Sequence, residues 1–463
     1  MKRFALFYVL LSFAMMVFAS CEKPNDDDID NLENNEIIDV PDENDTIPAA
    51  FYEVIDDIQL VALDFVDDMF SSLEQTEQTI AFKEFMVSYI NNATDKVERE
   101  LGVDGIELGL RKVSYIYNSV DAQNAPIQLS SVAFWRGYYL NQEWHDLSPD
   151  DICLMEHYTI SADKECPTQG FPLELMITGN VLTIMPDYLG YGITKHLTHP
   201  YLNHEICAVN SIDALPSGYT LFNNLSSSDM KDGWKLSVLG ASQGGGNALA
   251  VHKYIDTHTG LSNLWNFSHS YCAVGPYNPA LTIEKYFESG KSALPVVFPM
   301  TIKAMFSSYP DILGKYTEEM MYSENYLQMK DSIDAMLESK NYTNSEISKV
   351  FLENVRITVD ENLANDEIYL SDLLSDVMFD ESSEIVKDLY KCLEKNNLTQ
   401  GWSPAHPIKL FYGKGDRVVP YENSISVHET FGSDKVSLIE ADETLDHQAV
   451  TVMWMLSVLL GGI

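Results

Sequence analysis

The chain has 463 residues, of which 45% are hydrophobic, so it can bury a substantial core in one large domain or in two to three ordinary ones. Its 70 acidic residues against 29 basic ones give a formal net charge of −41. A surface this acidic repels polyanions, which argues against nucleic acid as a partner.

The first residues have the features of an export signal, which we place at residues 1–20. The basic pair Lys2 and Arg3 precedes an apolar run that is too short for a stable membrane span. Small residues then lead directly into Cys21. This junction resembles the lipobox of bacterial lipoproteins, in which the cysteine is lipidated and becomes the new N-terminus. The resemblance implies export and a lipid anchor on Cys21 in the bacterial outer membrane. The alternative is an ordinary secretory signal with an incidental cysteine.

Residues 21–50 are rich in Asp, Glu and Asn and include prolines, so they cannot bury enough apolar surface to fold. We expect this segment to be a disordered acidic tether. An acidic run this close to Cys21 also resembles the export signal of surface lipoproteins in the Bacteroides group, which points to the cell surface.

Helical periodicity appears at several places beyond residue 50. Apolar residues between 51 and 101 predict one helix through 55–70 and another through 82–90. A helix over 206–215 is expected to stop at Pro216 and Gly218. The apolar stretch 450–460 is too short to span a bilayer and is predicted to be a terminal helix packed on the sheet.

The remaining regular segments are predicted strands that alternate with helices. Strand-forming runs lie at 112–118, 129–135, 152–157, 181–186, 234–239, 268–274, 408–412 and 435–440. The pattern predicts an α/β fold, with a mostly parallel eight-stranded sheet and helices on both faces. In such sheets the functional site lies at the carboxyl ends of the strands.

Residues 281–400 interrupt this alternation. They are predicted to be helical, and their first half is rich in methionine and aromatic residues. An insertion at this point of the sheet lies above the site, so we expect a lid or cap. The alternative is that its apolar side chains form only the insertion's own core. The α/β core is then divided into a first part, 51–280, and a last part, 401–463.

One stretch joins a strand, a sharp turn and a helix. It contains Gly240-Ala241-Ser242-Gln243-Gly244, which is the pattern G-x-S-x-G in the context that a serine nucleophile needs. The glycines permit the turn, and the following helix N-terminus favours negative charge. The pattern indicates Ser242 as the nucleophile. The alternative is a glycine-rich turn with a surface serine.

A serine nucleophile requires a base, and the base requires an acid that fixes its tautomer. The sequence offers both in the order Ser, Asp, His. Asp416 follows the strand 408–412, and His447 follows the strand 435–440, so both should lie at the same edge as Ser242. Asp442 and Asp446 are rival acids. Asp446 is adjacent to His447 in sequence, which makes a contact with Nδ1 awkward, so we predict Asp416.

An oxyanion hole requires two N–H donors. The backbone of Gln243 is expected to supply one. The second is expected from the loop Glu156–Ser161, which resembles the His-Gly-x turn of lipases and esterases with Tyr158 in place of the glycine. By this match the second donor is the N–H of Thr159, with that of Tyr158 as the alternative.

Together, the elbow, the triad order, the Gly-x-Gly-Asp-x-x-Val-Pro loop at 413–420 and the helical insertion resemble the α/β-hydrolase superfamily from about residue 112 to the end. The segment Pro186–Gly192, followed by His199-Pro200-Tyr201, resembles its branch of secretory lipases and bacterial lipoprotein esterases. The resemblance implies an α/β-hydrolase fold with a cap. It also implies a lipase- or esterase-like serine hydrolase that cleaves small-molecule carboxylic esters through an acyl-enzyme, with no metal or organic cofactor. The alternatives are a serine peptidase of the same fold and a non-catalytic surface lipoprotein that binds a glycan or a protein.

Three further features concern Asp187, His199 and the cysteines. Asp187 is expected to be structural, and His199 is expected either to line the pocket or to pack against Tyr201. With Cys21 lipidated, the other cysteines are odd in number and cannot all pair, and the sequence does not assign a disulfide; they are Cys153, Cys166, Cys207, Cys272 and Cys392.

Overall fold

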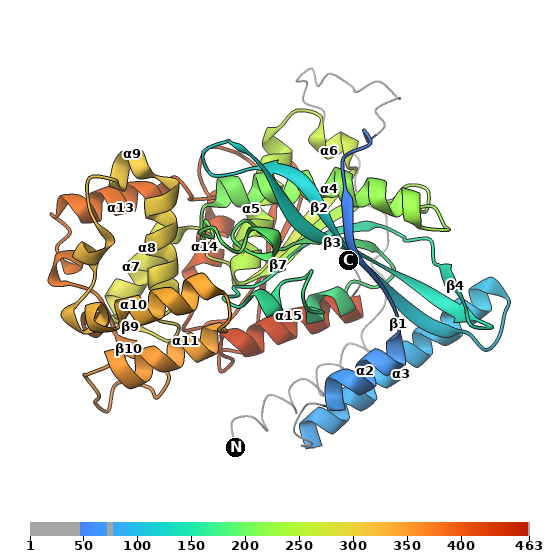
Figure 1. Cartoon of the computed structure of the whole chain (residues 1–463), viewed down its shortest axis with the longest axis horizontal. Coiled ribbons are helices and arrows are strands. Elements are labelled where there is room, and N and C mark those ends of the chain that lie inside the picture. Colours follow the sequence, from blue (N-terminus) through green and yellow to red (C-terminus); the bar gives the residue numbers. More distant parts are fainter. Residues whose placement is uncertain (1–46, 72–76, 462–463) are drawn as a thin grey trace.

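A single mixed sheet runs through the centre of the computed structural model, which describes residues 47–71 and 77–461 (Figure 1). In the described part of the chain this sheet has ten strands, ordered β1-β2-β3-β6-β5-β7-β8-β11-β12, with β4 paired to β3. The strands are β1 (Glu53–Val61), β2 (Glu107–Val120), β3 (Pro126–Leu140), β4 (Glu143–Asp146), β5 (Ile152–Glu156), β6 (Leu182–Pro186), β7 (Leu236–Ala241), β8 (Phe267–Ala273), β11 (Ile408–Tyr412) and β12 (Val436–Glu440). The predictions for residues 1–20, for Cys21 and for the tether as far as residue 46 lie outside the described residues.

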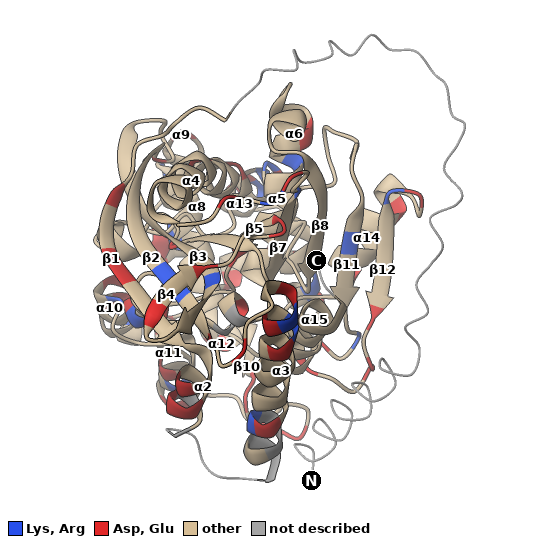
Figure 2. Cartoon of the chain, turned by 90° about the vertical axis from the view of Figure 1, so that its right-hand side faces the viewer, with Lys and Arg blue, Asp and Glu red and all other residues tan. Residues whose placement is uncertain are grey.

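The strands β6, β5, β7, β8, β11 and β12 are parallel neighbours, whereas β1 to β4 pair antiparallel at the other end of the sheet. Figure 2 shows the strands side by side from β1 to β12, with α3 (Glu77–Leu101) and α15 (His447–Gly461) in front of them. All eight predicted strands are present. The expected count of eight is too low, because β1 and β4 extend the antiparallel end.

Strand β1 corrects the sequence-based expectation of a helix through residues 55–70. The strand occupies Glu53–Val61 and pairs antiparallel with β2, and the helix α2 (Ala62–Ser71) begins only after it. Apolar residues in this segment match a helical spacing, but Val54, Ile55 and Ile58 are β-branched and suit an edge strand. Pairing with the long strand β2 therefore overrides a local periodicity.

Two apolar cores lie on the two faces of the sheet, and alternate strand residues belong to different cores. Leu236 and Val238 of β7 join the core beneath α4 (His204–Leu225), α5 (Gln243–Thr257) and α14 (Glu422–Phe431). Leu239 and Ala241 join the core beneath α2, α3 (Glu77–Leu101) and α15 (His447–Gly461). The short helix α6 (Leu261–Leu264) precedes β8. The predicted helices at 82–90 and 450–460 are parts of α3 and α15.

Helix α4 does not stop at Pro216, contrary to the expectation from sequence; it continues to Leu225. A proline removes one backbone donor and costs helix stability, so tertiary contacts must compensate. The hydroxyl of Tyr115 donates to the carbonyl of Ala214 at 2.9 Å, in the same helical segment. Gly218 lets the helix lie close to the sheet, because a Cβ there would approach Ile184 Cδ1 to 2.8 Å.

The insertion forms a separate helical layer beside the sheet, at the left of Figure 1, with an apolar core of its own. Its helices are α7 (Pro279–Ser289), α8 (Val297–Ser308), α9 (Pro310–Leu313), α10 (Glu324–Ser339), α11 (Asn344–Val350), α12 (Leu370–Leu373) and α13 (Glu384–Glu394). A short antiparallel pair, β9 (Lys291–Ser292) and β10 (Ile368–Tyr369), joins it. Short turns of other helix types complete the chain: η1 (Asp163–Glu165), η2 (Leu173–Met176), η3 (Gly192–Thr194), η4 (Glu318–Met321), η5 (Phe351–Val355) and η6 (Asp376–Phe379).

Two further observations concern the whole described chain. Within residues 47–71 and 77–461, no helix has both the length and the apolar character needed to cross a membrane. The cysteines that the structure describes are all buried free thiols, namely Cys153, Cys166, Cys207, Cys272 and Cys392. Burial raises the pKa of each thiol, which makes them unreactive core residues.

Candidate active site

Ser242 lies at the turn between β7 and α5 with φ 57° and ψ −126°, a backbone conformation that residues other than glycine rarely adopt. The turn is tight because its glycines touch other backbone atoms. A Cβ on Gly240 would collide with the backbone of Gly244, and a Cβ on Gly244 would collide with the carbonyl of Glu156. The N–H of Ser242 donates to the carbonyl of Ala273 at 2.9 Å, which fixes the turn to the neighbouring strand. The strained serine is therefore held by its surroundings.

The structure brings Ser242, His447 and Asp416 into one hydrogen-bonded chain. His447 Nε2 lies 2.9 Å from Ser242 Oγ, and His447 Nδ1 lies 2.7 Å from Asp416 Oδ2. The carboxylate cannot donate, so Nδ1 carries the proton and Nε2 is left to accept from the serine hydroxyl. The Asp416 side chain is fully buried and that of His447 is 13% exposed. The other oxygen of Asp416, Oδ1, accepts from the N–H groups of Val418 and Val419 at 2.8 and 2.9 Å, which orients the carboxylate.

The two rival acids have other partners. Asp446 Oδ1 accepts from the N–H of Ala449 at 3.0 Å, so this residue caps the start of α15. Asp442 Oδ1 accepts from the N–H and the hydroxyl of Thr444 at 2.9 and 2.6 Å. The geometry thus places Asp416, and neither rival, against His447 Nδ1.

Ser242, Gln243 and Thr159 line one small cavity. The backbone N–H of Gln243 is at the first position of α5, where it has no acceptor within the helix. Among the described residues no acceptor faces the N–H of Thr159 either. An oxyanion requires two N–H donors, and both residues line the same cavity as Ser242. The N–H of Thr159 stays the predicted second donor, with that of Tyr158 as the alternative.

Hydrogen bonds and ring stacking by His157 and Tyr188 hold the loop that carries Thr159. His157 Nδ1 lies 2.7 Å from the carbonyl oxygen of Tyr158, and the His157 ring stacks on Tyr188 with 3.9 Å between ring centres. The Tyr188 hydroxyl donates to the carbonyl of His157 at 3.1 Å. Burial lowers the pKa of His157 to about 4, so the ring is neutral at physiological pH. A neutral, stacked imidazole holds the loop without adding a charge beneath the serine.

A contact that the sequence did not predict connects His199 with the site. His199 Nε2 lies 2.6 Å from the amide nitrogen of Gln243, and its Nδ1 lies 2.7 Å from the carbonyl of Leu189. The amide donates to Nε2 while Nδ1–H donates to the carbonyl, which fixes the tautomer. Burial is the main reason that the pKa of His199 is lowered to about 3. Of the two alternatives raised for His199, packing near Tyr201 is observed, with 6.1 Å between the ring centres. His199 lines the larger neighbouring cavity, whereas the described residues that line the cavity at Ser242 do not include it.

The insertion contacts both loops of the site. The side-chain amide of Asn344 donates to the carbonyl of Thr159 at 2.6 Å, beside the expected oxyanion donor. The hydroxyl of Tyr286 donates to the carbonyl of Val418 at 2.6 Å, two residues after Asp416. Arg417 pairs with Asp366 at 2.7 Å and with Glu367 at 2.8 Å. The insertion therefore covers the serine, and the cavity there has a volume of only about 30 Å³.

Two buried carboxyl groups lie behind the site. Asp187 accepts from Ser130 Oγ at 2.6 Å and from the N–H and hydroxyl of Thr168 at 2.9 and 2.6 Å, in agreement with the structural role expected for it. Burial raises its pKa to about 6. Glu156 is completely buried next to the elbow, and neither carboxyl oxygen has a partner at hydrogen-bond distance. Burial raises the pKa of Glu156 to about 7. The nearby hydroxyl groups of Ser211 and Tyr188 favour the charged form and lower the pKa in part.

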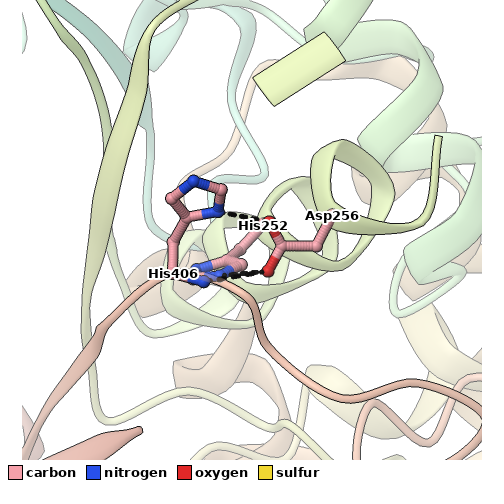
Figure 3. Close-up of side chains that lie close together, drawn as sticks. All are labelled: His252, Asp256 and His406. Carbon is pink, nitrogen blue, oxygen red and sulfur yellow. Dashed lines mark hydrogen bonds and ion pairs between the residues drawn. The ribbon is translucent and has the colours of Figure 1, made fainter. Parts of the chain in front are cut away.

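Outside the serine site, one cluster has the residue types of a metal centre (Figure 3). Asp256 Oδ2 lies 3.0 Å from His252 Nε2, and Asp256 Oδ1 lies 2.6 Å from His406 Nδ1. Zinc bonds of about 2.0–2.1 Å in a tetrahedron would hold ligand atoms roughly 3.3 Å apart. The observed spacings are those of hydrogen bonds. Through these hydrogen bonds the cluster ties α5 to the segment that precedes β11.

Comparison with known proteins gives a fold but no close relative. No protein-family model and no curated protein sequence matches the chain. Among solved structures, the rice cell wall degrading esterase LipA from Xanthomonas oryzae superposes with a TM-score of 0.61 at 18% identity, covering 90% of this chain and 96% of that one. A putative hydrolase from Legionella pneumophila superposes with a TM-score of 0.61 at 17% identity, covering 88% and 95%. The chain has the α/β-hydrolase fold.

Within the α/β-hydrolase fold, the observed positions follow the arrangement expected for a functional site. Ser242 follows β7, Asp416 follows β11 and His447 follows β12, so all three lie at the carboxyl ends of parallel strands. The insertion leaves the sheet after β8 and returns before β11, which places it over the same edge.

Proposed function

We propose that this α/β-hydrolase is an exported serine hydrolase that cleaves carboxylic esters. The observation that carries the proposal is the continuous hydrogen-bonded chain from Asp416 through His447 to the strained Ser242. Structural likeness to an esterase agrees with the proposal but does not by itself assign a substrate.

The reaction begins when Ser242 Oγ attacks the ester carbonyl. His447 Nε2 takes the hydroxyl proton, and Asp416 stabilises the imidazolium that forms. The carbonyl oxygen becomes an oxyanion, which the N–H groups of Gln243 and Thr159 hold at the N-terminus of α5. His447 then protonates the alcohol oxygen, the carbon–oxygen bond breaks and an acyl-enzyme remains.

Water completes the cycle. It attacks the acyl carbon while His447 takes its proton, the second oxyanion collapses, and the proton returns to Ser242 Oγ as the acid leaves. Each step uses only side chains and backbone groups of this chain. We therefore propose no metal or organic cofactor for the reaction.

A fluorophosphonate probe tests the nucleophile directly. Wild-type protein should be labelled, and Ser242→Ala should lose the label together with several orders of magnitude in turnover. Ser237→Ala is the matched control, because Ser237 lies on the same strand and is buried; it should label normally. Full labelling of Ser242→Ala would refute the assignment. A panel of p-nitrophenyl esters beside aminoacyl anilides distinguishes an esterase from a peptidase.

We also propose a lipid anchor on Cys21, on the strength of the apolar run and the small residues before it. Two or three acyl chains would hold the protein firmly at the outer membrane. The wild-type protein should incorporate labelled palmitate in a bacterial host, and Cys21→Ala should not. Equal absence of label in both proteins would favour a plain secretory signal.

A further inference from the structure

A second and larger cavity adjoins the serine site. It lies between the segment Lys195–Tyr201 and the helices α8 and α10 of the insertion, with a volume of about 480 Å³. Tyr201 lines this cavity and the serine cavity alike. His199 lines it too, and bonds on its other side to Gln243 at 2.6 Å. A ligand in this cavity is therefore one layer of side chains away from the proposed oxyanion hole.

Lys340 follows the last residue of α10 and is one of the residues that line this cavity. The residue is only 9% exposed, and its Nζ lies 4.4 Å from the centre of the Tyr191 ring. Among the described residues no carboxylate lies within ion-pair distance of this Nζ, and no acceptor bonds to it. Lys340 thus shares the cavity lining with Tyr201 and His199.

The other lysines of the cavity differ from Lys340. Lys195 pairs with Asp163 at 3.3 Å, and Lys303 pairs with Asp334 at 3.2 Å. The two carboxylates in the cavity lining, those of Glu318 and Glu338, also lie by Lys303, at 3.7 and 3.8 Å. In a chain with 70 acidic and 29 basic residues, carboxylates are in large excess over cations. A buried ammonium without a counter-ion is costly, and an aromatic face offsets only part of that cost. Its charge is thus left free to act on a ligand.

We propose that this cavity is a subsite for the anionic part of an ester substrate, with Lys340 binding a carboxylate. The proposal rests on the proposed function, because the cavity adjoins the serine site. The flexible ammonium would donate charge-assisted hydrogen bonds to the carboxylate while the ester carbonyl lies at Ser242. Because Tyr201 lines both cavities, its side chain would have to turn aside for one substrate to occupy both. The substrate class is then an ester that carries a carboxylate at a distance from the scissile bond.

The test compares p-nitrophenyl monoesters of dicarboxylic acids, from glutarate to sebacate, with neutral p-nitrophenyl esters of the same chain length. The measured quantity is the ratio of kcat/KM for the acidic ester over that for its neutral partner. Lys340→Met should lower this ratio by about ten- to a hundred-fold at the best chain length, as expected for the loss of a hydrogen bond to a charged group. Lys195→Met is the matched control, because Lys195 lines the same cavity but its ammonium is already paired with Asp163; it should change the ratio less than two-fold.

A second measurement uses the wild-type protein alone. Burial lowers the pKa of Lys340 to about 8, and the negative charges of the Cys166 thiolate, Asp163 and Glu338 oppose this by raising it. Deprotonation removes the positive charge, so the preference for acidic esters should fall between pH 7 and pH 9.5. The Tyr191 ring and neutral His199 face the same nitrogen and stay uncharged over this range.

The outcomes separate the two proposals. If Lys340→Met leaves the ratio unchanged, or if the wild-type ratio does not vary with pH, the anionic subsite is wrong while the serine hydrolase stands. An equal fall in Lys195→Met would also overturn it, because a general surface charge would then explain the preference. Absence of Ser242-dependent hydrolysis of both ester series would refute the proposed function itself.

Discussion

Replacement of Asp416 by asparagine is the sharpest test of the site. The side-chain carbonyl of the introduced asparagine can still accept from the N–H groups of Val418 and Val419, which Asp416 Oδ1 binds at 2.8 and 2.9 Å, so the loop should keep its shape. The amide nitrogen would then face His447 Nδ1, where the carboxylate oxygen lies at 2.7 Å. An amide donor there forces the proton of the imidazole onto Nε2, which can no longer accept from Ser242. We expect kcat for a p-nitrophenyl ester to fall by about 10⁴ at neutral pH, as for the same change in other triads.

Asp446→Asn is the matched control for this prediction. Asp446 caps α15 through the N–H of Ala449, and an asparagine oxygen can make the same hydrogen bond. Its kcat should stay within about three-fold of the wild type, because asparagine and aspartate are comparable capping residues. Thermal unfolding of both variants checks that they are folded. Near-normal activity of Asp416→Asn together with a collapse of Asp446→Asn would show that the assignment of the acid is wrong.

Three further predictions concern buried polar groups. The Glu156 carboxyl has a pKa of about 7 in the folded protein, against 4.5 in the unfolded chain. As the pH rises between these values, the unfolded chain releases the proton first, so the free energy of unfolding of the wild type should fall by about 3 kcal/mol relative to that of Glu156→Gln. Urea unfolding at several pH values measures this difference. A constant difference across that range would contradict the burial argument. Asp187→Ala removes the acceptor of hydrogen bonds from Ser130 and Thr168 and should cost about 3 kcal/mol or more, whereas a cost below about 1 kcal/mol would mean that water replaces the carboxylate. Asp256→Ala should lower the midpoint of thermal unfolding by several degrees, because His252 and His406 lose their shared hydrogen-bond partner. Addition of a chelator or of zinc should leave the midpoint of the wild type unchanged. A rise of the midpoint with zinc would favour a metal centre.

The sequence predicts the parallel half of the sheet better than its antiparallel end. Buried parallel strands such as β7 are continuous apolar runs bounded by turn residues, and each one lies at its predicted place. Strand β1 is at the edge, and most of its side chains are exposed, so its composition carries little information about burial. Its state depends on pairing with β2, a contact between distant segments that local periodicity does not encode.

The same distinction applies to the site. Ser242, Asp416 and His447 each follow a recognisable strand in a fixed chain order, so their convergence at one edge could be predicted from topology. The contact between Gln243 and His199 could not, because it depends on the path of a loop with no regular element. Lys340 is harder still, since only the fold shows that this lysine, unlike Lys195, lacks a carboxylate partner. Local motifs thus locate the reacting groups, and the groups that support them or select a ligand require the packed structure.

The insertion has a consequence for how a substrate reaches Ser242. The cavity at the serine holds no more than a few water molecules, while an acyl chain and its alcohol need a volume of several hundred Å³. We therefore expect the insertion side chains that line it, including Ile283 and Val297, to move when a substrate enters. Because Asn344 bonds to the carbonyl of Thr159, any displacement of α11 also releases the loop that carries the proposed oxyanion donor. On this expectation, the movement that admits an ester would loosen the proposed oxyanion hole, and closure over the bound substrate would restore it.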